Sequence, residues 1–436
     1  MDPLVILGHG IGGRGDLPLP VGALVVGACA ALVISFVVLL AAWPHPRLHR
    51  WARVRPLCSL PARVTSVLSA FGRVIGGLVV LTTVVSLLLV DDNPIENIAP
   101  RLIYVFLWVV VPLASVVVGD LWRWLSPFEA IAALRDRRVA ARSPVPPSTT
   151  SLVPAAVALA LFHWIELSFH DPAGRSVLRV LVAGWVVAGV TAAWQGGTER
   201  LRRRDPLAVW CSLLASMSPV VVRDGRIGWR VPGSGLAEVG RPAGLTLVVA
   251  VVLGGTTFDG VSRTQQWAEL LGTRTGWSAT LVNTIGLALC TAGVVALYTG
   301  AVVAMERMTG RSVAGTADRL AVALVPVAVG YSLAHYFSLA VFEGQFLVIQ
   351  ASDPFARGWD LFGWRASYPS YTAVSTTTIA VVQAAGVVLG HLIGVVVGHD
   401  LALRDLEGRH FRRGQLPLLG AMMVFTSLGL WLLVSA

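Results

Sequence analysis

Histidines and carboxylates recur near the ends of three long apolar stretches of this sequence. The segment FHWIELSFHDP carries His163, Glu166 and His170 at a spacing that places all three on one face of a helix. The segment GYSLAHYFSLAVFEGQ carries His335, and GGTTFDG carries Asp259. Ionisable side chains within apolar stretches cost free energy to bury, so they are candidates for a functional site.

We predict that four of these side chains form a metal site in an outer pocket. Imidazoles and carboxylates are the ligands that zinc, manganese and iron sites use. A divalent metal bound there would lower the pKa of a water molecule and polarise an ester oxygen. The predicted ligands are His163, Glu166, His335 and Asp259. The predicted rim of the pocket consists of His9, Arg14, Asp16, His170 and Glu343.

Two other interpretations of these residues stay open. Each group could be hydrogen-bonded within a helix bundle or at its surface, without any ligand. His163 and His335 could also face each other at one depth and bind a b-type haem, which is the less favoured cofactor.

A second polar layer is predicted further along the apolar stretches. It consists of Asp120, Gln383 and His391. If its stretch is helical, His391 lies about 28 Å from the start of that stretch, at a rise of 1.5 Å per residue. We therefore expect this inner polar layer to be separate from the outer pocket.

The elements that must position these groups are membrane-spanning helices. Hydrophobic residues make up 55% of the 436 residues and charged residues 13%, about half the charged fraction of a soluble domain. The apolar residues occur in unbroken runs, several of them long enough to cross a bilayer as a helix. We predict an all-α fold, a polytopic integral membrane helix bundle that forms a single transmembrane domain over residues 1–436.

The sequence predicts about ten spans. They are Val21–Trp43, Val74–Val90, Leu102–Asp120, Leu152–Leu167, Val177–Trp194, Ala243–Thr257, Ala279–Met305, Leu320–Phe342, Thr372–Gly398 and Leu416–Val434.

Arginines alternate with these spans. The connections that would lie on one side of the membrane contain 26 of the 34 basic residues. The positive-inside rule assigns that side to the cytoplasm, which places both termini at the exterior face of a cell inner membrane. The net charge of +10 is thus explained by topology and by contact with the lipid bilayer, and we expect no nucleic-acid partner.

Two connections are long enough to have structure of their own. The basic cytoplasmic loop over residues 195–242 could hold an amphipathic helix and a short hairpin that lie on the lipid headgroups. The aromatic exterior loop over residues 343–371 is expected either to cap the outer pocket or to lie against the headgroups.

Four segments carry a family resemblance. They are GHGIGGRGDLPLP, GDLWRWLSPFEAIA, GTTFDGVSRTQQW and SDPFARGWDLFG. Together with the span pattern they resemble the bacterial multi-pass membrane proteins named fenitrothion hydrolases. The resemblance implies hydrolysis of an organophosphorus ester, but it supplies no catalytic motif to carry over. The chain contains neither G-x-S-x-G nor H-E-x-x-H.

Three functions therefore stay open. The outer pocket favours a metal-assisted hydrolase that acts on an amphiphilic ester at the exterior face. Two polar layers at different depths would also suit a transporter or permease for a small solute. A structural or assembly subunit would use the same polar residues only to bind its helices together. The substrate and the oligomeric state are not predicted.

Overall fold

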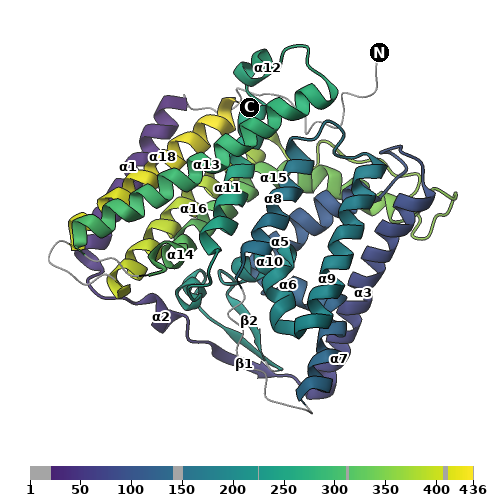
Figure 1. Ribbon diagram of the computed structural model, residues 1–436, viewed down its shortest axis with the longest axis horizontal. Helices are drawn as coiled ribbons and strands as arrows, with labels where there is room; N and C mark the ends of the chain where they lie inside the picture. Colours follow the sequence, from purple (N-terminus) through teal and green to yellow (C-terminus); the bar gives the residue numbers. More distant parts are fainter. Residues whose placement is uncertain (1–20, 141–150, 224, 311–313, 406–410, 436) are drawn as a thin grey trace.

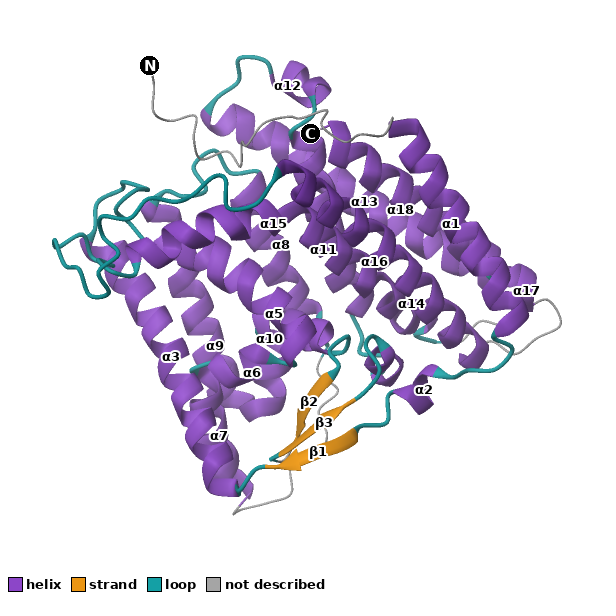
Figure 2. Ribbon diagram, turned by 180° about the vertical axis from the view of Figure 1, so that it is seen from behind, coloured by secondary structure: helices purple, strands orange, loops and turns teal. Residues whose placement is uncertain are grey.

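The computed structural model describes residues 21–140, 151–223, 225–310, 314–405 and 411–435 (Figure 1). Within these ranges the protein is a helix bundle with one small sheet at one end, as Figure 2 shows in purple and orange. Each of the ten predicted apolar stretches is helical. The prediction of an all-α polytopic membrane bundle is confirmed.

Nine helical units among the described residues are long and apolar enough to cross a membrane. They are α1 (Val21–Ala42), α3 (Ala62–Leu89), α4–η2–α5 (Ala99–Val118), α9 (Arg175–Arg204), α11 (Leu245–Ser262), α13 (Gly276–Thr309), α14–η4–α15 (Thr316–Gln350), α16 (Thr376–Asp405) and α18 (Leu416–Ser435).

The tenth predicted span is the shorter helix α8 (Val153–Leu167). Its 15 residues extend about 22 Å, less than the roughly 30 Å of a hydrocarbon core. α8 packs against α11, and one of its faces, which includes Leu159 and His163, is buried. Its neighbours thus cover a helix that is too short to span the lipid by itself.

The remaining helices are short. They are α2 (Leu48–Trp51), α6 (Leu121–Leu125), α7 (Phe128–Ala140), α10 (Pro206–Ala215), η3 (Ser234–Glu238), α12 (Gln265–Leu271) and α17 (Phe411–Gly414).

The first and last spans, α1 and α18, reach the same end of the bundle. α1 begins, and α18 ends, at the end of the bundle that carries α12 (Figure 1). We call this the α12 end and the opposite one the sheet end. The described part of the chain therefore begins and ends at the same end of the bundle.

The sheet at the opposite end joins two connections that are far apart in sequence. Strands β2 (Val220–Arg223) and β3 (Arg226–Trp229) form the predicted hairpin. β1 (Arg55–Ser59), which follows α2, pairs antiparallel with β3 and gives the order β1-β3-β2. The sequence analysis missed β1. The helix in the same loop is α10, which is buried and does not lie on the surface as an amphipathic helix.

The centre of the bundle is formed by α11, α15 and α16. In the most apolar stretch of α14–α15, 83% of the residues are buried. In the corresponding stretch of α3, only 22% of the residues are buried. Gly330 of α15 lies so close to α16 that a Cβ there would overlap the carbonyl oxygen of Gly386, and a Cβ at Gly390 would lie 2.5 Å from the carbonyl oxygen of Pro326. Small residues of this kind allow membrane helices to approach closely.

This contact makes a stability prediction. Gly330→Ala should lower the free energy of unfolding in detergent by about 1–3 kcal/mol, because the new methyl group must displace the α16 backbone. Gly344 on the same helix has open space around it. Gly344→Ala should therefore be neutral or stabilise by up to about 1 kcal/mol. Thermal unfolding of both variants checks this, and an equal response would contradict the packing described.

Candidate functional site

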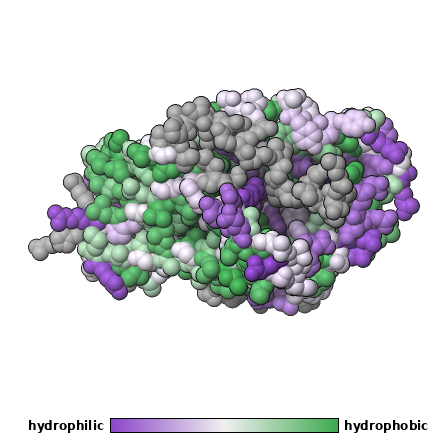
Figure 3. Space-filling view, turned by 90° about the horizontal axis from the view of Figure 1, so that it is seen from above, coloured by the Kyte–Doolittle hydropathy of each residue, from purple (hydrophilic) through white to green (hydrophobic). Residues whose placement is uncertain are grey.

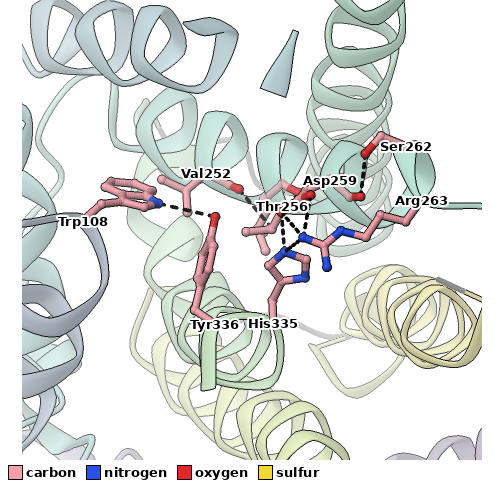
Figure 4. A network of polar contacts seen from close by, with 9 residues as sticks. Trp108, Val252, Thr256, Asp259, Ser262, Arg263, His335 and Tyr336 are labelled. Atoms are coloured by element: carbon pink, nitrogen blue, oxygen red, sulfur yellow. Dashed lines mark hydrogen bonds and ion pairs between the residues drawn. The ribbon is translucent and has the colours of Figure 1, made fainter. Parts of the chain in front are cut away.

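Asp259 lies near the α12 end of α11, where it contacts two cationic or protonatable groups (Figure 4). Its carboxylate accepts a hydrogen bond from Nη2 of Arg263 at 3.1 Å and forms an ion pair with Nε2 of His335. Nη2 of Arg263 also lies 2.9 Å from Nε2 of His335. We call these three residues the Asp259 cluster.

Local helix geometry accounts for the cluster. Arg263, the residue that ends α11, follows Asp259 by four positions, so the two side chains lie on the same face. α15 packs beside α11 and supplies His335. A carboxylate buried in an apolar bundle is costly unless cations and hydrogen-bond donors surround it. The pairing therefore stabilises Asp259 in its place.

The cluster is enclosed but can be reached from the α12 end. The side chain of Asp259 is 5% exposed, that of His335 11%, and that of Arg263 30%. Figure 3, which views this end from above, shows hydrophilic and hydrophobic side chains side by side on this face. A ligand that arrives from this side would meet the guanidinium of Arg263 first.

Aromatic residues connect the cluster to α8. Tyr336, next to His335, has its hydroxyl 3.4 Å from Nε1 of Trp108, which donates to it. The Trp108 ring lies edge-on to the ring of His163, with centroids 5.1 Å apart. Trp108 belongs to the π-helical segment η2 (Leu102–Val110), a backbone form that occurs frequently at functional sites.

Two polar side chains of α8 have atoms that are covered yet unpaired. His163 is 1% exposed, and its Nδ1 donates to the carbonyl oxygen of Leu159 at 2.7 Å. Its Nε2 therefore carries the lone pair. No described residue bonds to this Nε2 or to Oε2 of Glu166. The His163 ring packs on Gly255, one turn before Asp259 on α11. Both groups thus remain available to a bound molecule.

The structure separates the four predicted metal ligands into two pairs. Asp259 and His335 are in contact, whereas His163 and Glu166 make no bond to them. No group of three or more His, Cys, Asp or Glu side chains among the described residues is placed to hold a metal ion. Arg263 lies where it contacts both Asp259 and His335, and its positive charge disfavours a cation there.

The predicted rim residues have other partners. His170 contacts Thr280, with Nδ1 3.0 Å from the hydroxyl oxygen. Glu343 accepts a hydrogen bond from Nε of Arg101 at 2.7 Å. The remaining three predicted rim residues, His9, Arg14 and Asp16, lie outside the described residues.

The predicted inner layer is not one site. Asp120 caps α6 by accepting from the Arg123 backbone N–H at 3.2 Å, and burial raises its pKa to about 6. α6 and α16 lie in different parts of the bundle (Figure 1). His391 on α16 is fully buried, donates from Nδ1 to Val387 and has no described partner for Nε2. Gln383 is half-buried on the same helix.

The segment GDLWRWLSPFEAIA has a structural role near Asp120. Trp122 donates from Nε1 to the buried Asp205 at 2.7 Å, and Glu129 accepts two hydrogen bonds from Arg202 at 2.6 and 3.0 Å. These bonds join α6 and α7 to α9 and to the start of α10. Packing at the sheet end therefore accounts for Trp122 and Glu129 in this segment.

Three residues of the site were missed by the sequence analysis. The signal for Arg263 was present, because it follows Asp259 by one helical turn within GTTFDGVSRTQQW. Tyr336 adjoins His335 in sequence. Nothing in the third apolar stretch distinguished Trp108 from a tryptophan at the membrane interface.

The cluster makes a second stability prediction. Asp259→Asn should lower the free energy of unfolding by about 3 kcal/mol, because it removes the charge that the guanidinium of Arg263 is paired with inside the bundle. Asp91→Asn is the control, since its side chain is 94% exposed and lies 3.9 Å from Arg175. The control should change stability by less than about 1 kcal/mol. The measurement is chemical unfolding of both variants. If Asp259→Asn and Asp91→Asn lower the free energy of unfolding by the same small amount, the Asp259–Arg263 pair is exposed to water, contrary to this description.

No protein-family model, curated protein or solved structure matches the chain. The inference of a function therefore depends on the residues and contacts described above.

Proposed function

We propose that this multi-pass membrane protein is a hydrolase that acts on an amphiphilic ester at the α12 end of the bundle. One observation carries the proposal. A carboxylate, an imidazole and a guanidinium form one enclosed cluster that is reached from that end. These are the groups needed to activate a water molecule and to bind the anionic oxygen of an ester in its transition state.

The contacts suggest a role for each residue. In the proposed mechanism Nε2–H of His335 donates a hydrogen bond to Asp259, which leaves the lone pair on Nδ1. Nδ1 takes part in neither the contact with Asp259 nor that with Arg263, and we assign it the role of general base. It would take a proton from water while the water oxygen attacks the phosphorus or carbonyl carbon. The ester bond to the leaving oxygen then breaks, and His335 returns the proton to that oxygen.

Arg263 is suited to the phosphoryl oxygens of the substrate, which gain negative charge in the transition state. Its guanidinium has donors beyond those directed at Asp259 and His335, and a planar guanidinium matches two oxygens of a phosphoryl group. Because it is the most exposed member of the cluster, it would bind the substrate first. The sequence resemblance favours an organophosphorus-type ester, and its segment GTTFDGVSRTQQW contains both Asp259 and Arg263.

The arginine distribution supports the membrane orientation of the proposal. The sheet end, which carries the arginine-rich connections, would face the cytoplasm, and the α12 end would face the exterior of the inner membrane. The predicted zinc, manganese or iron ion stays a prediction. Asp259 and His335 would supply two protein ligands to it, whereas catalytic zinc sites usually have three.

One observation favours transport as a second candidate. His391 is fully buried in α16 with an unpartnered Nε2, and it takes no part in the Asp259 cluster. Buried ionisable groups at two separate places in a bundle are typical of proton-coupled transporters. Under hydrolysis alone, His391 has no role beyond packing.

The two candidates differ in their response to substitution. His335→Ala should lower kcat for an amphiphilic phosphotriester by roughly 100-fold or more, because the general base is lost. His391→Ala should retain kcat within about threefold. Initial rates are measured on purified protein in liposomes, with metal content determined on the same samples.

Other outcomes would redirect the assignment. Full turnover in His335→Ala would contradict the proposed base. Loss of solute or proton flux in His391→Ala, with no ester turnover in the native protein, would establish transport instead. Stoichiometric metal lost in His335→Ala would support the metal-assisted mechanism, and stability defects without any activity would indicate an assembly subunit.

A further inference from the structure

The loop between α15 and α16, residues 351–375, directs large apolar side chains outward. Their exposed fractions range from 44% at Trp364 to 90% at Tyr368. The full set is Trp359, Leu361, Phe362, Trp364, Tyr368 and Tyr371. An apolar patch of this kind usually marks a surface that is covered by a partner or by a membrane.

The loop's own polar groups hold this arrangement in place. The buried Ser352 donates from its hydroxyl to Asp360 at 2.8 Å, and Asp360 also accepts from the Arg365 backbone N–H at 3.1 Å. Asp353 accepts from the Arg357 backbone N–H at 2.8 Å. Two of these hydrogen bonds keep the pKa of the Asp360 carboxyl below its usual value. The backbone N–H of Arg365 has the larger effect and the hydroxyl of Ser352 the next largest. The carboxylates thus stabilise the loop, while the rings face outward.

The position of the loop identifies what lies against it. The loop connects the ends of two membrane-spanning helices and projects sideways past the end of α3 (Figures 1 and 2). Nε2 of Gln350, just before it, donates to the carbonyl oxygen of Ile95 at 2.7 Å. Ile95 is exposed, as are Leu88 and Leu89 on the outer face of α3. The apolar surface of the loop therefore continues the lipid-facing surface of α3.

We propose that residues 351–375 bind the headgroup region of the bilayer beside α3. Tryptophan and tyrosine favour this depth because an apolar ring and a polar atom can both be satisfied there. The exposed Arg357 and Arg365 side chains lie among the rings and match the phosphates of phospholipids. The loop is therefore a lipid-binding surface, and this inference does not depend on the proposed hydrolase activity.

The test measures the depth of the loop in a bilayer. Phe362→Cys is labelled with an environment-sensitive fluorophore in a chain from which Cys29, Cys58 and Cys290 have been removed. Cys211 is kept, because its thiol is buried and should not react. The protein is reconstituted into phosphatidylcholine and phosphatidylglycerol vesicles with or without a nitroxide on the lipid headgroup. Glu269→Cys, an exposed polar position on α12, which projects beyond the end of the bundle (Figure 1), serves as the reference.

We expect a blue-shifted emission at position 362 that the headgroup nitroxide quenches at least twofold more than at position 269. The result should not change when the protein is diluted tenfold in lipid. Emission typical of water, with equal quenching at both positions, would overturn the proposal. Protection that disappears on dilution would overturn it too, because a second copy of the chain would then be what covers the loop.

Discussion

The carboxylate of Asp259 imposes the constraint on which the α12 end of the bundle depends. A charge that is almost fully enclosed by helices must be compensated by nearby cations and donors. Arg263 supplies compensation from the same helix and His335 from the neighbouring one. The cluster can form only if α11 and α15 lie side by side in the register observed. The close packing of α15 on α16 at Gly330 and Gly390 stabilises one side of this arrangement.

The remaining polar groups of the bundle fall into two kinds. Some are fully used in packing, such as Asp205 between Trp122 and Trp185 at the sheet end. Others keep an unpaired atom. Nine such atoms occur among the described residues, and three of them belong to residues predicted as site residues, Nε2 of His163, Oε2 of Glu166 and Nε2 of His391. Most buried polar atoms are satisfied in native proteins, so the second kind indicates where a water, proton or substrate is to be expected. Two of these three atoms belong to α8, which packs against the helix that carries Asp259.

The sequence was sufficient for the helices but not for the details of the site. Long apolar runs predicted the nine membrane-length helices and the shorter α8. Asp259, expected near the same rim as His335, is in contact with it. Spacing along one helix could not show how the helices are rotated against each other. In the structure His163 and Glu166 make no bond to Asp259 or His335, and their grouping as metal ligands stays a prediction. The strand β1 was missed because its partner β3 lies far along the chain, and such pairings have no local signal.

The most direct test of the account is a structure of the protein in lipid with a non-hydrolysable phosphonate amphiphile bound. The account predicts phosphonate density against the guanidinium of Arg263, with one oxygen accepting a hydrogen bond from Nδ1 of His335, which is protonated in this complex as it would be after taking a proton from water. Its acyl or aryl group should point toward Tyr336 and Trp108. A phosphonate bound elsewhere in the bundle, with the Asp259 cluster closed and unchanged, would contradict a catalytic role for the cluster and leave it a structural ion pair.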